Sequence, residues 1–364
     1  PSCISQNITP HFTQLSMKSL FTFNPTTRKW HFPFMAGLSV GIPMVIGWLT
    51  NNFEAGKLAS LAGLSILYMQ SDKLVERMVI LMTCCFGITL SYAVGLLFSF
   101  NYFLAPVALG ALSFGIHYSL HHLQLTRPPG NFFFIMIAST AICTPFDPES
   151  IPMKIGYVAL GTILTSFIAL IYSLITLKKK ADSSTFTTNK DVETNIVESI
   201  VFGIFIALSL AVAFALQIEN PYWVPISCLA VMQGSNSKHT WIRGTQRIIG
   251  TFIGLVLTWS IAYIHPTPLF MVIGIIILQI IVEFLIVRNY TVAVIFITIL
   301  TIFLAESGNQ LSQNANAVFF ARLVDILIGS AIGIIGGWIL YHEKVHFYTK
   351  RQLIRLSKKE QLVD

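Results

Sequence analysis

The chain has 364 residues, of which 54% are hydrophobic and 11% are charged, and its net charge is +7. A soluble domain carries about 25% charged residues, so this composition argues against an ordinary soluble protein. Long apolar blocks without the period-2 alternation of a transmembrane barrel instead predict an all-α, polytopic membrane protein.

The N-terminal residues 1–31 contain no apolar run of the signal-peptide type, and we expect them to form a cytoplasmic segment. Beyond them, apolar blocks alternate with short polar clusters. Blocks of about 20 residues have the length that crosses a ~30 Å hydrocarbon layer as a helix. We predict about twelve transmembrane helices, over 32–49, 57–70, 78–98, 102–119, 131–145, 153–176, 197–216, 221–233, 245–264, 267–286, 290–305 and 319–341.

The distribution of basic residues favours twelve crossings. With a cytoplasmic N-terminus, 20 of the 23 Lys and Arg residues fall inside, and only Lys57, Lys154 and Arg322 fall outside. If the short second and fifth segments of each half re-entered without crossing, the balance would be 13 against 10. The positive-inside rule therefore favours the first arrangement, with both termini cytoplasmic.

The chain divides into two sequence-related halves. We expect a first six-helix repeat over 32–176, a polar cytoplasmic linker over 177–196 and a second repeat over 197–341. Residues 342–364 form a basic amphipathic tail, which we expect to lie along the inner leaflet. Because six is an even number of crossings, the two halves would be parallel repeats.

Several residues recur at matching places in the two halves. Met69-Gln70 ends one short segment and Met232-Gln233 ends its counterpart. Arg127 and Arg288 each precede another pair of short segments, and Arg77 and Arg247 each open the following long helix. Short helices at corresponding positions of repeats indicate where a transporter binds its substrate. Gln70, Gln233, Arg127 and Arg288 are therefore candidate substrate-binding residues.

Arg243 and Arg247 lie four residues apart at the predicted cytoplasmic mouth of one helix. A guanidinium fork suits a carboxylate, so both are candidate substrate-binding residues for an organic anion. Positive charge that only sets the topology is an equally good interpretation. Trp223, beside Pro221 and Pro225 in a short segment, is either part of the site or an interfacial anchor.

Ionisable residues inside a membrane are costly and often functional. Arg322 and Asp325 share a helix face and either pair to fix helix packing or take part in proton coupling. Glu283 and His122, which fall on matching positions of the two halves, are further proton-coupling candidates. His117, His121 and His122 lack a completing ligand, so we expect no metal site.

Other features are expected to be structural. Four of the five cysteines lie inside apolar blocks and predict small buried hydrophobes without disulfides. The Gly250-x-x-x-Gly254 and Gly329-x-x-x-Gly333 patterns predict close helix packing, and the second suits a homodimer equally well. The net positive charge follows membrane sidedness, so we expect a lipid bilayer and no nucleic acid as partner.

The second half, about residues 200–340, resembles the fusaric acid resistance/aromatic acid exporter superfamily. The similar motifs are Tyr222-Trp223-Val224-Pro225, Met232-Gln233, Arg247-x-x-Gly250-Thr251-x-x-Gly254 and Arg322-x-x-Asp325-x-x-x-Gly329. The first half is similar only in hydropathy and in residues 126–130. The resemblance implies a multi-pass transporter of the bacterial plasma membrane that exports aromatic or other organic acids, with proton coupling as an expectation. It adds Thr251 to the candidate binding residues.

Alternatives remain open. Distant similarity to plant malate-channel proteins implies an anion channel of the same architecture, and a membrane scaffold or envelope-assembly component is a third interpretation. No phosphate-binding loop for ATP and no H-E-x-x-H or G-x-S-x-G motif is present, so we expect neither a cofactor nor an enzyme.

Overall fold

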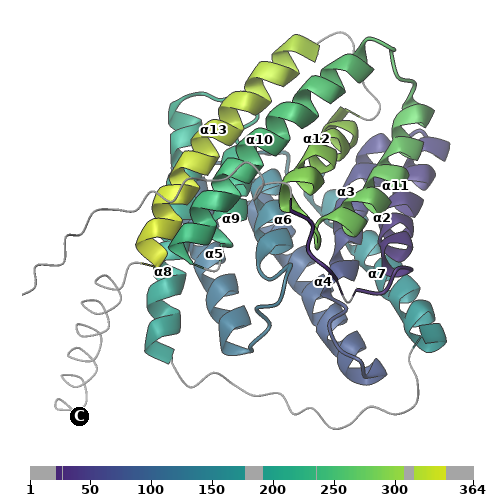
Figure 1. Ribbon diagram of the computed structural model, residues 1–364, viewed down its shortest axis with the longest axis horizontal. Coiled ribbons are helices and arrows are strands. Elements are labelled where there is room, and N and C mark those ends of the chain that lie inside the picture. Colours follow the sequence, from purple (N-terminus) through teal and green to yellow (C-terminus); the bar gives the residue numbers. More distant parts are fainter. Residues whose placement is uncertain (1–21, 27, 177–191, 235, 307–314, 342–364) are drawn as a thin grey trace, which may run out of the picture.

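The computed structural model describes residues 22–26, 28–176, 192–234, 236–306 and 315–341. In this part of the chain the secondary structure is helical throughout, with twelve α-helices and one 3-10 helix (Figure 1). The helices are α2 (Phe32–Leu49), α3 (Phe53–Gly63), η1 (Leu64–Tyr68), α4 (Leu74–Leu97), α5 (Leu104–His122), α6 (Phe132–Ile142), α7 (Ile151–Thr176), α8 (Val192–Ala215), α9 (Trp223–Met232), α10 (Ser237–Ala262), α11 (Pro268–Leu285), α12 (Tyr290–Glu306) and α13 (Ala315–Leu340).

Each of the twelve predicted segments coincides with one of these α-helices, which confirms the all-α class. The boundaries differ most at the start of α10, which begins at Ser237 and not at 245, and they differ at two further places. Helix α8 begins at Val192, so the last part of the predicted linker is helical, and the segment predicted over 57–70 is α3 followed by η1. Residues 1–21, most of the linker and the basic tail over 342–364 lie outside the described part of the chain.

Seven described helices, namely α2, α4, α7, α8, α10, α11 and α13, are long and apolar enough to cross a membrane. Three shorter apolar helices accompany them, over Phe132–Ile142, Trp223–Met232 and Tyr290–Glu306. The chain is therefore a polytopic membrane protein. The twelve crossings stay a prediction, because a ten-residue helix such as α9 spans only ~15 Å.

The same helix contacts recur in the two parts of the chain. Helix α7 packs against α3 and α4, and α4 also packs against α6. Correspondingly, α13 packs against α9 and α10, and α10 packs against α12. Between the two parts, α5 lies along α8, and α2 lies along α11 (Figure 1). In each pair the fourth predicted segment of one half contacts the first predicted segment of the other half.

The short helices lie inside the bundle. In α9 every residue from Val224 to Met232 is buried, and α6 is buried over most of its length. A helix that exposes no face to lipid must be enclosed by other helices, and α13, α8, α10 and α6 contact α9. Because these helices are short and enclosed, we expect their polar ends and the loops that follow to lie inside the protein, at the depth of the hydrocarbon layer.

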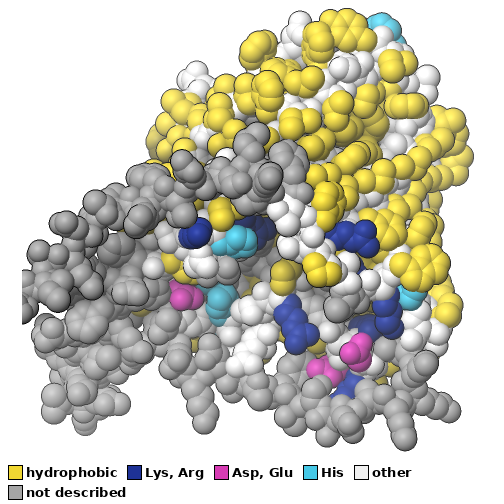
Figure 2. Space-filling model, in the orientation of Figure 1, with side chains coloured by type: hydrophobic (Ala, Val, Ile, Leu, Met, Phe, Trp, Pro, Cys, Tyr) yellow, Lys and Arg dark blue, Asp and Glu magenta, His cyan; other side chains and the backbone are white. Residues whose placement is uncertain are grey.

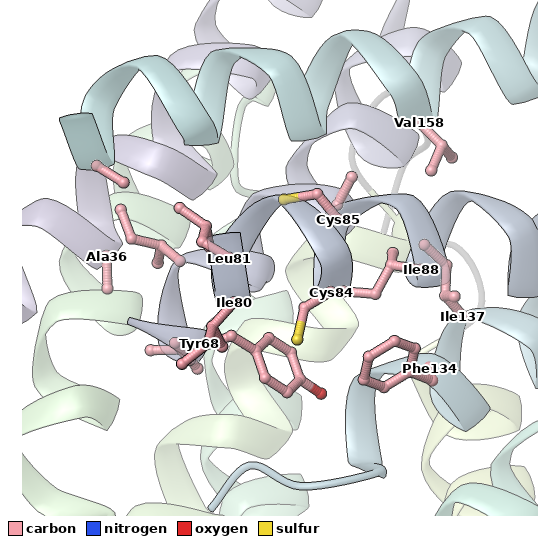
Figure 3. Packing of buried hydrophobic residues seen from close by; sticks show 14 of the residues in the cluster. Ala36, Tyr68, Ile80, Leu81, Cys84, Cys85, Ile88, Phe134, Ile137 and Val158 are labelled. Atoms are coloured by element: carbon pink, nitrogen blue, oxygen red, sulfur yellow. The ribbon is translucent and has the colours of Figure 1, made fainter. Parts of the chain in front are cut away.

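One core cluster fixes η1 and the loop before α6. The Tyr68 ring lies beside Cys84 and Phe134 (Figure 3), with its centroid 5.3 Å from that of Phe134. Its hydroxyl donates a 2.7 Å hydrogen bond to the Gly130 carbonyl oxygen. Cys84, Cys85 and Cys228 are buried free thiols, and Cys143 is partly buried and free, as predicted.

Glycines let the helices approach closely. A Cβ atom on Gly329 would collide with the Val224 carbonyl oxygen of α9, and one on Gly333 would lie 2.7 Å from the Cys228 carbonyl oxygen. On α10, Gly250 and Gly254 face α12 in the same way. The predicted packing role of these glycines is confirmed, and the α13 face is occupied within the chain.

The surface is divided by polarity. In Figure 2 hydrophobic side chains cover the upper part of the molecule, whereas the visible Lys, Arg, Asp and Glu side chains gather in the lower part. The lower part holds the start of α4 and the start of α8 (Figure 1). This arrangement agrees with an apolar zone facing lipid and a charged zone at one membrane surface.

Candidate functional site

Five charged side chains are buried in the described part of the chain: Arg77, Arg247, Glu283, Arg322 and Asp325. Two of them have ion-pair partners, because Arg77 lies 3.8 Å from Asp72 and Glu283 lies 2.6 Å from Arg28. The other three belong to α10 and α13, which pack together. Two guanidinium groups and one carboxylate leave this cluster with a net charge of +1.

Helix α9 supplies the neutral side chains of the cluster. The turn at Pro221 lets the helix begin at Trp223, and Ser227 follows one turn later on the same face. Trp223 is only partly buried, yet Arg322 covers one face of its ring. It is therefore part of the cluster and not only an interfacial anchor.

Arg322 is held by two contacts. Its guanidinium carbon lies 3.2 Å from the centroid of the Trp223 ring, and its Nη2 donates a 2.9 Å hydrogen bond to the Thr301 hydroxyl of α12. A cation over an indole face is attracted by the ring quadrupole, most strongly where water is excluded. These contacts place the guanidinium between α9, α12 and α13.

Arg247 enters the cluster from α10. Its Nη2 donates a 3.3 Å hydrogen bond to the Ser227 hydroxyl, while its Nε is buried and has no hydrogen-bond partner among the described residues. Thr251, one turn further along α10, is also buried. A guanidinium with an unused donor inside the protein is a ready ligand for an acceptor such as a carboxylate.

Asp325 is fully buried, and neither carboxylate oxygen has a hydrogen-bond partner in the described part of the chain. The suggestion that it pairs directly with Arg322 is wrong for this conformation, because no described nitrogen–oxygen pair of the two lies within 4.0 Å. The physical reason is that Arg322 turns towards Trp223 and Thr301. Arg322 nevertheless interacts electrostatically with Asp325 and Arg247.

The side-chain amides of the two candidate glutamines donate hydrogen bonds to a loop. The Gln70 amide donates to the carbonyl oxygens of Arg127 (3.2 Å) and Pro128 (3.4 Å). The Gln233 amide donates to the carbonyl oxygen of Pro129 and to Asn131 Oδ1, both at 3.2 Å. Glutamines from both parts of the chain thus converge on the loop that precedes α6.

Arg243 lies at the same end of the bundle. Its Nη1 donates to the Gln233 carbonyl oxygen at 2.9 Å, and its guanidinium carbon lies 4.7 Å from the centroid of the Tyr290 ring. Arg127 and Arg288 are exposed on the loops before α6 and α12. We call Arg127, Arg243 and Arg288 the mouth arginines.

The structure separates Arg243 from Arg247, which the sequence had grouped. It also changes the match between the halves, because α4 begins at Leu74, four residues after Gln70, and α10 begins at Ser237, four residues after Gln233. At this register Arg77 aligns with Thr240 and not with Arg247. At the same register the buried Arg247 aligns with Cys84, so the match of Arg247 to a basic residue of α4 is lost.

Two proton-coupling candidates lie apart from the cluster. Glu283 on α11 is paired with Arg28 and accepts a 3.3 Å hydrogen bond from Gln279. His122 ends α5 and stacks on Tyr118, with ring centroids 6.0 Å apart. Glu283 already has a counter-ion, so it is a structural residue in this conformation.

Sequence reasoning did not single out Ser227, Thr301 or Arg28 as site residues. No motif marks Ser227 or Arg28, and only the fold brings them to their partners. Within the described residues no group of three His, Cys, Asp or Glu side chains could hold a metal ion.

Comparison with known proteins agrees with the resemblance. Residues 206–336 match the family described as "Fusaric acid resistance protein-like", so this part of the chain is similar to that family. It contains α9 and α10 together with Arg322 and Asp325 of α13. The cluster therefore lies wholly within the family segment.

The curated relatives are bacterial. An uncharacterized membrane protein, YvaC of Bacillus subtilis, is 35% identical over 162 residues, which are 44% of this chain and 25% of that protein. An uncharacterized protein of Haemophilus influenzae is 27% identical over 186 residues, 50% of this chain and 25% of that protein. The matched segments thus cover a quarter of each relative's length. No solved structure matches.

Proposed function

We propose that the protein is a secondary transporter that exports small organic or aromatic acid anions across a bacterial plasma membrane. The observation that carries the proposal is the net positive charge of the buried cluster formed by Arg247, Arg322 and Asp325. An uncompensated charge inside a membrane protein is costly. A substrate carboxylate supplies the missing negative charge and accepts hydrogen bonds from the guanidinium groups.

The binding roles follow from the contacts. Arg247 and Arg322 bind the carboxylate, and Trp223 with Thr301 keeps Arg322 in position. Thr251, one turn from Arg247, is a further neutral contact. The mouth arginines attract anions to the cytoplasmic entrance, and Gln70 and Gln233 hold the loop that carries Arg127.

The architecture suits alternating access. We propose twelve crossings, two parallel six-helix repeats and cytoplasmic termini. The packing of α7 on α3 recurs as the packing of α13 on α9, which supports the repeats. The contacts between the repeats also correspond, because α5 packs against α8 and α2 packs against α11. Rocking of the two repeats against each other would expose the cluster first to one side of the membrane and then to the other.

We also propose that transport is coupled to protons. Asp325 is the carboxylate of the cluster, and the absence of hydrogen-bond partners on either oxygen supports a group that gains and loses a proton. Glu283 is a weaker candidate because Arg28 neutralises it. His122 lies outside the cluster.

Reconstitution tests the function. Purified protein in proteoliposomes loaded with labelled benzoate should release it faster than protein-free vesicles, and Arg247→Gln should abolish the difference. A proton gradient of either sign should change the rate for a coupled transporter, whereas an anion channel would give electrical currents that ignore the proton gradient. Release equal to that of empty vesicles would favour the scaffold interpretation.

A further inference from the structure

We infer that Asp325 determines the charge of the transported anion, because Asp325 and the substrate together supply the two negative charges that balance Arg247 and Arg322. With Asp325 ionised, the site accepts anions that carry one negative charge and rejects those that carry two. The inference rests on the proposed function and specifies the substrate class of the same site.

The balance concerns only three side chains, because their charged neighbours are compensated elsewhere. Glu219 interacts with Asp325 but is exposed to solvent. Glu306 interacts with Arg322, and also with Lys57, whose Nζ donates a 2.7 Å hydrogen bond to the adjacent Ala305 carbonyl oxygen. Tyr222 is neutral at physiological pH.

Asp325 acts on the anion through its charge alone. Arg322 is engaged by Trp223 and Thr301, and Arg247 is engaged by Ser227, so neither guanidinium reaches the carboxylate for a direct pair. Among the described residues, none donates a hydrogen bond to either oxygen of the buried carboxylate. Its field is weakly screened at this depth, and it lowers the attraction of the cluster for every further negative charge.

The sum of charges then selects the substrate. Two guanidinium groups and an ionised Asp325 leave one positive charge, which a monoanion neutralises. A dianion would leave an excess negative charge in a poorly screened site, unless Asp325 took up a proton. Uncompensated buried charge is strongly unfavourable, so monoanions are preferred.

The first half offers no second site of this kind. The sequence match places Lys154 and Tyr157 opposite Arg322 and Asp325. Lys154 lies 3.7 Å from Glu54, and the Tyr157 hydroxyl accepts a 3.2 Å hydrogen bond from Asn52. The ammonium group is thus paired and a phenol stands in place of the aspartate, so the described residues of the first half form no equivalent site at this position.

The test measures the flux of benzoate and of isophthalate into proteoliposomes at about pH 7.5, where both aromatic acids are fully ionised. The wild type should prefer benzoate by about tenfold or more, since a mismatched buried charge costs at least that factor. Asp325→Asn should reverse the preference, because the cluster then carries two positive charges, which a dianion neutralises. The double variant R247Q/D325N should prefer benzoate again, because one positive charge remains.

Two controls keep the charge of the cluster unchanged. Asp325→Glu should keep the benzoate preference, and so should Glu54→Gln, which removes an exposed acidic group outside the cluster. An equal or inverted preference in the wild type, or an unchanged ratio in Asp325→Asn, would overturn the inference while leaving the transport proposal in place. No flux of either acid by the wild type would overturn the transport proposal itself.

A folding defect is handled by a second measurement. If Asp325→Asn does not fold, the wild type and R247Q/D325N are compared by their thermal stabilisation in detergent with each acid. Stabilisation of both by benzoate more than by isophthalate supports the inference. Equal stabilisation of the wild type by the two acids overturns it.

Discussion

The guanidinium of Arg322 stacks on the indole of Trp223, with its carbon 3.2 Å from the ring centroid. This contact, and not an ion pair with the aspartate one turn away, determines where the arginine charge lies. It connects α13 to the start of α9, the short helix enclosed by the bundle. The position of the charge in the cluster therefore depends on an aromatic side chain.

Replacing Trp223 should weaken anion binding. A cation–π contact that is shielded from water contributes about 2 kcal/mol, so Trp223→Ala should raise the benzoate concentration for half-maximal flux by about tenfold or more. Trp223→Phe keeps an aromatic face, so its benzoate concentration for half-maximal flux should lie between those of the wild type and Trp223→Ala. Flux measured in proteoliposomes over a range of benzoate concentrations checks this. Unchanged half-saturation in Trp223→Ala would refute the positioning role.

Removing Arg28 should destabilise the fold. Glu283 is 4% exposed and Arg28 is 27% exposed, so the variant Arg28→Ala leaves a buried carboxylate without its counter-ion. Breaking such a pair costs about 3–5 kcal/mol. Thermal unfolding in detergent should show a lower midpoint for Arg28→Ala and partial recovery in R28A/E283Q, which removes the stranded charge. Equal midpoints for the wild type and Arg28→Ala would contradict the structural role of the pair.

A matched pair of glycine variants tests the packing of α13. In Gly329→Ala the new Cβ atom collides with the backbone oxygen of Val224, which cannot move aside as a side chain can. Overpacking of this kind costs about 1–3 kcal/mol. Gly115→Ala places its Cβ atom in open space, with no atom within 4 Å. We expect a lower unfolding midpoint only for Gly329→Ala, and equal effects of the two variants would argue against the close approach.

Cysteine labelling tests the number of crossings. Asp72 is 94% exposed in the loop before α4, and twelve crossings place it in the cytoplasm, whereas re-entrant short segments place it outside. Asp147 is exposed in the loop before α7 and lies outside in both arrangements. In intact cells a membrane-impermeant maleimide should label Asp147→Cys and leave Asp72→Cys unlabelled, with the unchanged chain as background. Labelling of both would reject the twelve-crossing arrangement.

The positions of the helices could be predicted from the sequence, because each apolar block is bounded by polar or charged residues. The boundaries were less predictable where polar residues continue a helix, as in α8, which starts at Val192. The change from α-helix in α3 to 3-10 helix in η1 left no clear signal, because the largely apolar residues from Leu61 to Tyr68 suit either helix type.

The site could be predicted only as separate residues. Arg247, Arg322, Asp325 and Trp223 were each singled out by charge, position or motif. Their grouping required the packing of α9, α10 and α13, which spacing along the chain does not encode. Arg77 was matched to Arg247 because each lies near the predicted start of a long helix, but α4 begins at Leu74 and α10 begins at Ser237, at equal distances from Gln70 and Gln233.

The central claim is that Arg247 and Arg322 together bind an organic anion inside the protein. Equilibrium binding of radiolabelled benzoate to the purified chain in detergent tests it most directly, with R247Q/R322Q as the comparison and Arg127→Gln as an exposed arginine control. We predict saturable binding of one benzoate per chain for the wild type and Arg127→Gln, and none for R247Q/R322Q. Saturable binding that persists in R247Q/R322Q, or its absence in the wild type, would contradict the account.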